Sequence, residues 1–426
     1  MAQERKYWDE EVETMPLDKL KKLQEEKLQE VVTRAYEKTA LYRRKFDKAG
    51  IRPTDIKTLD DLKKLPLTSY LDDFCYTPPL EKLAVPMEEV KTINSTSGTL
   101  SGFTQPILIS KRDWEFYFYG EARSRWTIGV RPQDVIQLLL GFESSSRGYQ
   151  AIGSTVLLAT AGRGNPDHQI RLAKEMNVTV IEHLPSLVLR YFERAKELGW
   201  DIRETELRLV AGVGEGWAET YKKRIEAQYG VLFRTLYGTA ETGGIGVECE
   251  QGGGMHLFTD CGIVEIVDPE TEKALGIGEE GEIVVTPLWN EAMPLIRYKT
   301  GDVGSLLPYQ PCPCGRTHPK MSMVKGRVAH IAKVDGKRVL PIDVEEIIAG
   351  IPGLGEEYQI ILDQPGELDR LKLKAEYQPE IKDVAALKNQ LEEALYRDLG
   401  VENEVELAPL RSLARALFKA QRLIHS

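Results

Sequence analysis

The sequence predicts an α/β protein with a large N-terminal domain of βαβ sheets and a smaller α+β domain at its C-terminal end. Between residues 104 and 240, helical stretches alternate with short apolar runs. The runs are 135–140, 154–158, 178–181 and 207–211. Strands interleaved with helices are typical of βαβ units and parallel sheets. Near residue 256 strands separated by a polar turn follow instead, which predicts a small antiparallel β unit.

The N-terminal region begins with a long helix predicted at 17–46. Leu28, Val31, Val32 and Ala35 recur at helical spacing, and the other positions are mostly charged. This pattern is typical of a helix that packs one face and exposes the other.

The C-terminal region after Arg327 alternates helices with strands and spans about 100 residues, the size of a small domain. In this region helices are predicted at 342–349 and 382–399, and strands at 358–363, 369–377 and 403–407. The antiparallel unit that precedes it has predicted strands at 262–268 and 281–286. We therefore predict an N-terminal domain at 1–326, with the antiparallel unit at about 256–326, and a C-terminal domain at 327–426.

Composition and charge exclude several classes of protein. The chain has 426 residues, of which 42% are hydrophobic and 29% charged, with a formal net charge of −10. The negative charge argues against nucleic-acid binding, and no apolar run approaches the roughly 18 residues that cross a bilayer. The first residues lack the apolar core of a secretory signal, so the cytoplasm is the expected location. Five cysteines do not indicate a disulfide framework here.

Four stretches carry residues suited to nucleotide chemistry. Residues 94–102 read Asn-Ser-Thr-Ser-Gly-Thr-Leu-Ser-Gly, and small hydroxyl residues and glycines let backbone N–H groups approach a phosphate. Glu241 lies in a tight turn at 237–244, and Asp302 offers a carboxylate suited to a ribose diol. Lys419 stands in an apolar C-terminal stretch. Each has an ordinary alternative when taken singly, namely a surface turn, a capping carboxylate or a surface lysine.

In this order and spacing, the four stretches resemble the adenylate-forming superfamily of acyl-CoA synthetases, and more closely the phenylacetate–CoA ligase family. Similar landmarks extend over nearly the whole chain. They are Tyr-Trp-Asp at 7–9, Glu-Thr-Met-Pro at 13–16, Leu-Pro-Ser at 184–186, Gly-Glu-Gly-Trp at 214–217, Glu-Ala-Met-Pro-Leu-Ile-Arg at 291–297 and Cys-Pro-Cys-Gly-Arg at 312–316. Such a set is specific for the family and much less specific for the acid.

The resemblance implies an AMP-forming ligase that converts a carboxylic acid and ATP to an acyl-adenylate and then transfers the acyl group to coenzyme A. It implies that Lys419 neutralises charge during adenylation, that Glu241 binds Mg²⁺, and that the C-terminal domain rotates about a hinge after Gly326–Arg327. The remaining implied ATP- and AMP-binding residues are Thr96, Ser97, Gly98, Thr99, Gly214, Glu215, Gly216, Thr235, Tyr237, Gly238, Thr239, Asp302 and Arg327. A homodimer is common among relatives, although no residue here demonstrates one.

Four further residues form a set suited to structural zinc: Cys249, His256, Cys312 and Cys314. Three thiolates and one imidazole match tetrahedral zinc, although a one-residue gap between cysteines is unusual. In some members of the family that this sequence resembles, similar cysteines bind zinc. His318 is an alternative ligand, and Cys75 and Cys261 are predicted to be buried thiols.

The sequence departs from the family pattern at several positions. Gly102 stands where the phosphate loop of the family usually carries a cation, and Thr235 stands where an acidic or amide residue is usual. Ala329, two residues after Arg327, stands where the hinge commonly has Asp or Lys. The tentative acyl pocket comprises Phe142, Glu143, Ser144, Arg147 and Gly212. This segment is more polar than a bare phenyl ring requires, so we expect a polar or small acid. Arg147 is then either the partner of a second anionic group or a surface arginine.

Two alternatives to an acyl-CoA ligase remain open. An adenylating enzyme could use an acceptor other than coenzyme A, as do relatives that adenylate a deazaflavin coenzyme. A non-catalytic nucleotide-binding protein is the second, and its support is the missing loop cation at Gly102.

Overall fold

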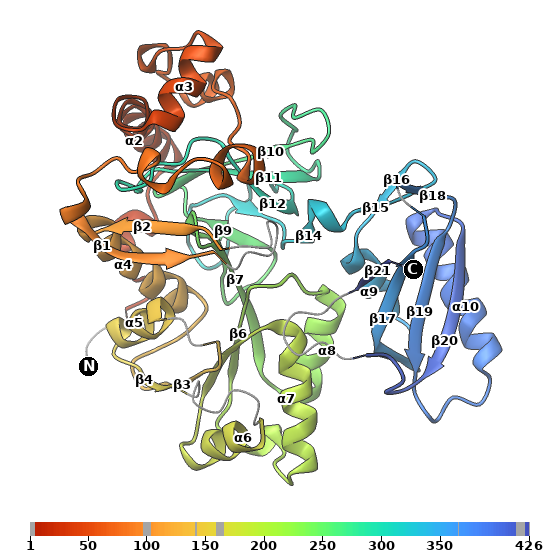
Figure 1. Cartoon of the computed structure of the whole chain (residues 1–426). Helices are drawn as coiled ribbons and strands as arrows, with labels where there is room; N and C mark the ends of the chain where they lie inside the picture. The colour runs from red at the N-terminus through yellow and green to blue at the C-terminus, as the bar shows by residue number, and fades with distance from the viewer. Residues whose placement is uncertain are drawn as a thin grey trace.

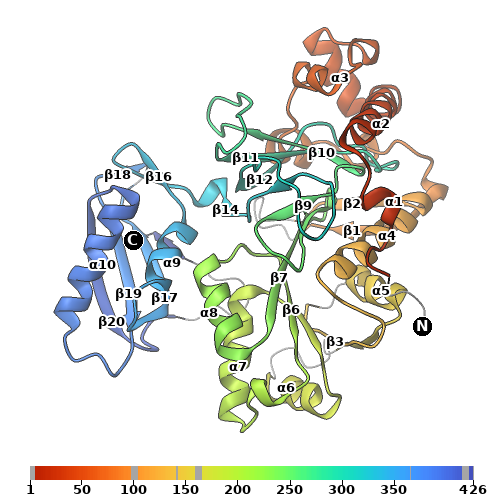
Figure 2. The same ribbon diagram turned by 180° about the vertical axis from the view of Figure 1, so that it is seen from behind.

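The computed structural model describes residues 5–96, 104–140, 143–158, 166–364, 366–414 and 422–425, with the side chain of Glu143 left aside. Figures 1 and 2 show a large N-terminal body and a smaller C-terminal one, joined near β14 (Gly326–Arg327). The predicted α/β class, with an appended α+β part, is confirmed.

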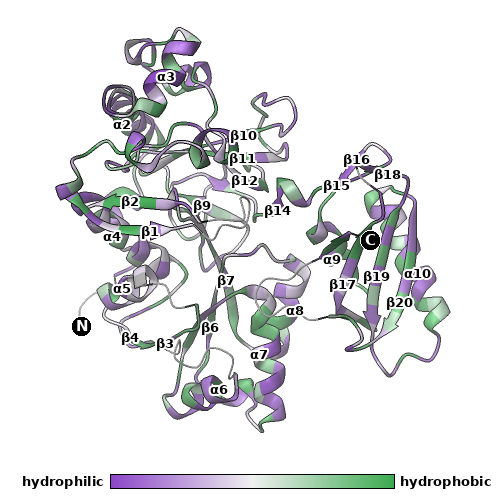
Figure 3. Cartoon of the chain, in the orientation of Figure 1, coloured by the Kyte–Doolittle hydropathy of each residue, from purple (hydrophilic) through white to green (hydrophobic). Residues whose placement is uncertain are grey.

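The N-terminal helices are α1 (Glu10–Glu13), α2 (Leu17–Lys38) and α3 (Ala40–Ala49). The prediction of one continuous helix at 17–46 is wrong, because Thr39 has extended backbone angles, with φ −118° and ψ 138°. Its hydroxyl accepts a hydrogen bond from the N–H of Tyr42 and so caps α3. In Figure 3 α2 and α3 are mostly hydrophilic, whereas β2 (Pro106–Ser110) is mostly hydrophobic.

An eight-stranded sheet forms the centre of the N-terminal body, in the order β13-β9-β8-β7-β6-β5-β3-β4. Its strands β3 to β7 are parallel, and β8, β9 and β13 are antiparallel additions. The parallel strands are β3 (Val135–Leu138), β4 (Thr155–Leu158), β5 (Val180–His183), β6 (Leu209–Val213) and β7 (Leu232–Thr239). The others are β8 (Gly243–Glu248), β9 (Met255–Leu257) and β13 (Lys320–Met321).

Helices cover both faces of this sheet, as the interleaved pattern predicts. They are α4 (Lys111–Thr127), α5 (Glu143–Ile152), α6 (Pro166–Glu175), α7 (Pro185–Glu197) and α8 (Glu219–Tyr229). Because side chains alternate along a strand, Ile181 and Val210 pack with α6, α7 and α8, whereas Val180 and Leu209 pack with α4 and α5. This alternation decides which residues face the cavity described below.

Two smaller sheets complete the N-terminal body. β1 (Val90–Ser95) pairs with β2, and an antiparallel sheet contains β10 (Gly262–Val267), β11 (Gly281–Pro287), β12 (Tyr298–Gly304) and β14. β9 and β13 lie in the range predicted for the antiparallel unit, yet they pair in the large sheet instead.

The C-terminal body holds its own core, formed between its sheets and two helices. Its helices are α9 (Pro341–Ala349) and α10 (Val384–Leu399). Its strands are β15 (Ala332–Val334), β16 (Lys337–Val339), β17 (Leu354–Leu362), β18 (Glu367–Leu368), β19 (Leu371–Tyr377), β20 (Asn403–Pro409) and β21 (Leu423–His425). Among the described residues, none of the helices combines the length and hydropathy that a membrane span requires.

Candidate active site

A cavity of about 1590 Å³ lies where β5, β6 and β7 end, and residues of both bodies line it. Open α/β sheets bind ligands at this carboxyl edge of their parallel strands. The cavity brings together predicted site residues that are far apart in the sequence. They are Thr96, Ser144, Gly214, Glu215, Gly216, Thr235, Tyr237, Gly238, Thr239, Glu241, Asp302 and Arg327.

One end of the cavity contains a carboxylate held by two donors. The Tyr237 hydroxyl donates to Oδ2 of Asp302 at 3.0 Å, and Nε of Arg327 lies 3.1 Å from Oδ1. Asp302 on β12 pairs directly with Arg327 on β14, so the sheet register fixes this contact. Burial and the neighbouring Asp302 charge raise the pKa of Tyr237 well above its usual value, which keeps the hydroxyl protonated as a donor.

The loop after β6 lies against the segment that precedes β14. Gly214 has φ +80°, a conformation that glycine adopts without strain, and Gly216 has no room for a side chain. A Cβ on Gly216 would lie 2.2 Å from the carbonyl oxygen of Val324. The Glu215 carboxylate accepts a hydrogen bond from the N–H of Ser186 at 3.2 Å, which ties this loop to the start of α7.

Thr96 closes the base of the predicted phosphate loop. Its hydroxyl accepts from the N–H of Gln105 at 2.9 Å, and its own N–H donates to the Gln105 carbonyl at 2.9 Å. The Tyr70 hydroxyl lies 3.3 Å from the same Thr96 oxygen. Thr96 therefore anchors the two ends of the loop; Ser97, Gly98, Thr99 and Gly102 lie outside the described residues.

Glu241 lines the cavity beside Tyr298 of β12. Burial raises the pKa of Tyr298 well above its usual value, and the hydrogen-bonded Glu241 carboxylate raises it further. The side-chain amide of Asn290 donates to the Glu241 backbone carbonyl at 3.2 Å and fixes the turn. Tyr298 has no counterpart among the predicted site residues, because a tyrosine inside a strand gives no distinctive sequence signal.

The tentative acyl-pocket residues have different surroundings. Ser144 lines the cavity, whereas the guanidinium of the exposed Arg147 lies over the rings of Trp114 and Phe118, at 5.5 and 5.1 Å. A Cβ on Gly212 would lie 2.5 Å from the Phe233 ring, so this glycine serves packing within the sheet. Phe142 and Lys419 lie outside the described residues, as does the side chain of Glu143.

Comparisons with known proteins fit this geometry. Residues 146–287 match the model of the AMP-binding enzyme family, and residues 336–426 match the AMP-binding enzyme C-terminal domain. A phenylacetate–coenzyme A ligase of Thermus thermophilus is 34% identical over 375 residues, which cover 86% of this chain and 83% of the relative. The chain belongs to the phenylacetate–CoA ligase family. The resemblance stated from the sequence is thereby confirmed.

Two solved structures of 2-hydroxyisobutyryl-CoA ligase bear on the arrangement of the two bodies. The ligase in its postadenylation state, with R3-HIB-AMP, is 25% identical, with a TM-score of 0.90 over 100% of this chain and 94% of that chain. The same ligase with 2-HIB-AMP and CoA in the thioesterification state gives 0.73 at 25% identity, over 100% and 93%. The structure of this chain is therefore more similar to the postadenylation state of that ligase than to its thioesterification state.

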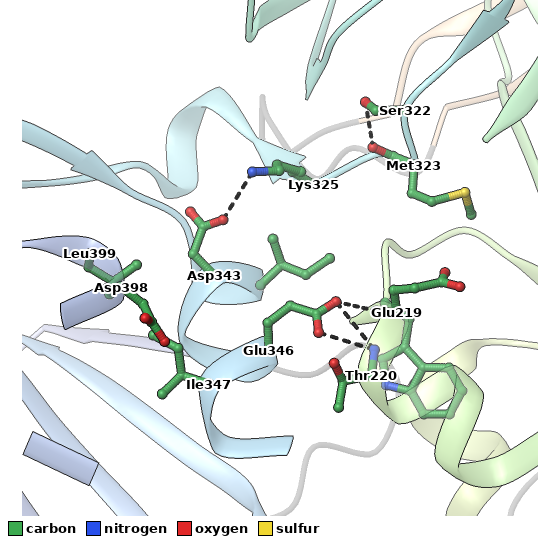
Figure 4. Close-up of a pocket in the computed structure, with 12 residues that line it drawn as sticks. Glu219, Thr220, Ser322, Met323, Lys325, Asp343, Glu346, Ile347, Asp398 and Leu399 are labelled. Carbon is green, nitrogen blue, oxygen red and sulfur yellow. Dashed lines mark hydrogen bonds and ion pairs between the residues drawn. The ribbon is translucent and has the colours of Figure 1, made fainter. Parts of the chain in front are cut away.

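In that arrangement α9 of the C-terminal body caps α8 of the N-terminal body. The Glu346 carboxylate accepts hydrogen bonds from the N–H groups of Glu219 and Thr220, the latter at 3.1 Å to Oε2. These N–H groups open α8, where a helix favours negative charge. Figure 4 shows the contact at the edge of a cavity of about 470 Å³ between the two bodies.

Ion pairs support the same contact between the bodies. Glu357 of β17 lies 2.7 Å from Arg190 of α7, and Arg224 of α8 lies 2.9 Å from Glu356. Arg422 also lies 2.7 Å from Glu357, so one carboxylate joins α7 to the strand region near the C-terminus.

The predicted zinc ligands are brought together. One ligand atom from each of Cys249, His256, Cys312 and Cys314 lies within 4.8 Å of the others. The Sγ atoms of Cys249 and Cys312 are 3.7 Å apart, and Sγ of Cys314 is 3.4 Å from Nε2 of His256. A tetrahedral zinc with bonds of about 2.3 Å to sulfur and about 2.0 Å to nitrogen separates such pairs by about 3.8 and 3.5 Å. The donor set therefore fits zinc.

The other cysteines and His318 have different roles. Nδ1 of His256 lies 2.9 Å from the His318 carbonyl, which leaves its Nε2 facing the thiols. The ring nitrogens of His318 lie 3.0 and 2.9 Å from the carbonyl oxygens of Leu257 and Val12, so the His318 ring joins the N-terminal segment to the sheet. Cys261 is buried as predicted, but the prediction for Cys75 is wrong because Cys75 is only half-buried in its short helical turn.

Proposed function

We propose that this protein activates a carboxylic acid with ATP to an acyl-adenylate and transfers the acyl group to coenzyme A. The carrying observation is the Tyr237–Asp302–Arg327 cluster, which lines one cavity with the glycine-containing loop at 214–216 and with Glu241. The class of reaction agrees with the names of the family relatives and with the acyl-AMP and CoA complexes of the similar ligase.

In the first half-reaction the substrate carboxylate attacks the α-phosphorus of ATP. A bond forms between the carboxylate oxygen and phosphorus, and the bond to the bridging oxygen breaks as pyrophosphate leaves with its electron pair. Asp302 would accept hydrogen bonds from the ribose hydroxyls, while Tyr237 and Arg327 hold its two oxygens in place. Orienting the nucleotide in this way contributes to the rate because the reacting atoms are already aligned.

The phosphate end of the site would rest on the loop that Thr96 anchors and on Glu241. Glu241 would hold Mg²⁺ together with the phosphate oxygens, and the ion offsets the charge of the phosphates when bound. Lys419 would neutralise charge that develops at the α-phosphate, where a fixed cation contributes most.

In the second half-reaction the thiol of coenzyme A attacks the acyl carbon. A carbon–sulfur bond forms, the carbon–oxygen bond to AMP breaks, and the thiol proton is released. We propose that the domains 1–326 and 327–426 change their arrangement between the steps, about Gly326–Arg327. The two states of the similar ligase differ in TM-score against this chain, which supports a rearrangement of the two bodies.

A structural zinc ion bound by Cys249, His256, Cys312 and Cys314 completes the proposal. It would tie the loop at 312–314 to β8 and β9, and the hydrogen bond from His256 to a carbonyl orients the imidazole for this purpose.

The test is pyrophosphate release with ATP, Mg²⁺ and a panel of carboxylic acids, with and without coenzyme A. We expect acid-dependent release that coenzyme A increases and that Lys419→Ala reduces by at least about 100-fold, consistent with loss of a charge-stabilising group. Lys382→Ala, at an exposed lysine of the same domain, is the control. Release that is indifferent to coenzyme A would favour another acceptor. ATP binding without release for any acid would contradict the proposal.

A further inference from the structure

A buried charged network lines the same cavity as the Tyr237–Asp302–Arg327 cluster, but its residues come from other elements, namely α4, α5 and β5. Its centre is Arg125 of α4, which pairs with Glu121 of the same helix and lies 2.9 Å from Glu182 of β5. The Arg125 guanidinium also donates to the Ser145 hydroxyl of α5 at 2.8 Å. All four residues line the cavity, beside the α5 segment to which the sequence assigns the acyl pocket.

The network has more carboxylates than cations. A second arginine that lines the cavity, Arg123, pairs with Asp260, whose two carboxylate oxygens each lie 2.9 Å from Nη1. The Nε atoms of Arg123 and Arg125 are buried and have no hydrogen-bond partner within the described residues. Arg123 and Arg125 thus face three carboxylates, Asp260, Glu121 and Glu182, which gives a formal charge of −1 (two positive, three negative). Both guanidinium groups are already ion-paired with carboxylates, and the surplus negative charge disfavours a second anionic group on the substrate.

Glu182 supplies the observation that points to a ligand. Its side chain is 0% exposed, and Oε2 accepts from Arg125 and from the Tyr149 hydroxyl at 2.8 Å. Its other oxygen, Oε1, is buried and has no hydrogen-bond partner within the described part of the chain. A buried carboxylate oxygen without a donor is costly, and a donor on a bound molecule would remove that cost.

The walls around the network are aromatic. Trp289 stacks with Phe116 at a centroid distance of 5.6 Å and meets Tyr117 edge-on at 6.0 Å, and all three line the cavity. A Cβ on Gly243 would lie 2.8 Å from the Trp289 ring, so a glycine at this position leaves room for the ring. Flat apolar walls with a few placed polar groups are typical of sites that bind a hydrophobic body in one orientation.

We infer that the acid activated here has a hydrophobic, preferably aromatic, acyl part bearing an N–H or O–H donor that binds Oε1 of Glu182. The inference rests on the proposed function and narrows its substrate class. It replaces the sequence-based alternative of a second anionic group bound by Arg147, because Arg147 is exposed, lies over Trp114 and Phe118, and is absent from the cavity lining. Glu182 is then a specificity-determining residue.

The experiment measures kcat/KM for pyrophosphate release with matched acids. The aromatic set is phenylacetate, its amino and hydroxy derivatives at each ring position, and 4-carboxyphenylacetate; isobutyrate and 2-hydroxyisobutyrate form an aliphatic pair. We expect the best donor-bearing acid to exceed phenylacetate by at least about tenfold, the lower range for a hydrogen bond to a charged group. The carboxylated acid should be poorest.

Glu182→Gln keeps the size of the side chain and removes its charge, and it should lower the preference for the donor-bearing acid by about tenfold. Glu175→Gln, an exposed position on α6, is the matched control and should keep the preference of the unmodified enzyme. AMP affinity and the melting temperature of each variant separate lost specificity from lost folding. If Glu182→Gln does not fold, Glu121→Gln and the acid panel on the unmodified enzyme carry the test.

The outcomes distinguish this inference from the proposed function. Acid-dependent release with phenylacetate or isobutyrate as good as the donor-bearing partner would leave the proposed function intact and overturn the inference. A uniform fall for all acids in Glu182→Gln would also overturn it, since a structural role has that effect. Absence of release with every acid would overturn both.

Discussion

Replacing Asp302 by asparagine tests the proposed nucleotide site in the cavity. The carboxylate accepts a hydrogen bond from the Tyr237 hydroxyl at 3.0 Å on Oδ2, and Nε of Arg327 lies 3.1 Å from Oδ1 in an ion pair. A carboxylate can accept about four hydrogen bonds, so Asp302 can accept from a ribose diol in addition to Tyr237. An asparagine amide offers one accepting oxygen and turns a donating NH₂ group toward the other donors. At least one hydrogen bond between a ribose hydroxyl and a charged acceptor is then lost.

Such a bond contributes about 1.5–3 kcal/mol, which corresponds to AMP binding about 10- to 150-fold weaker. The assay is calorimetric titration of both proteins with AMP and with 2′,3′-dideoxy-AMP. The unmodified enzyme should prefer AMP, and Asp302→Asn should lose that preference while binding the dideoxy nucleotide nearly as before. Asp363→Asn, which removes the charge of an exposed carboxylate paired with Lys372, is the control. An equal loss for both nucleotides, or no loss, would refute the assignment.

The remaining predictions concern the zinc ligands, the contact between the two bodies and pH. Cys314→Ser should reduce bound zinc from about one ion per chain to nearly none and lower the melting temperature, because the metal contributes to folding; equal zinc content by elemental analysis would contradict this. Glu346→Gln should weaken the contact with α8 by about 0.5–2 kcal/mol and speed trypsin cleavage near Arg327; unchanged cleavage would argue against the contact. Burial lowers the pKa of His183 to about 4, so the unfolded chain, with a pKa of about 6.5, binds a proton first as pH falls. Stability should therefore decline between about pH 6.5 and pH 4, by about 2 kcal/mol at pH 5. His183→Asn should flatten that decline in urea unfolding at pH 7.5 and 5, and an unchanged slope would contradict the prediction.

The sequence by itself predicted the fold class correctly, together with most of the elements, and it supplied the candidate residues of the proposed nucleotide site. The runs 135–140 and 178–181 overlap strands β3 and β5, because a short apolar run bounded by polar turns is a local signal of a buried strand. Gly214 belongs to the same local category, because its positive φ is a property of the backbone at that position. Gly216 does not, because its lack of room comes from Val324, which is far away in the sequence. Asp302 and Tyr237 are candidates because the short continuous stretches that contain them resemble motifs of the family.

Only the tertiary structure decided which residues meet in the proposed acyl part of the cavity. Arg125 and Glu182 are 57 residues apart and lie in a helix and a strand whose local patterns are otherwise unremarkable. The alternation of side chains places Glu182 on the same face as Val180, toward α4 and α5. The sequence does not show that Arg125 of α4 lies within hydrogen-bonding distance of it. The roles of Gly212 and Arg147 were decided in the same way, by Phe233 and by Trp114 and Phe118. The role of a charged side chain depends on the groups that folding brings close to it, and here those groups are far away in the sequence.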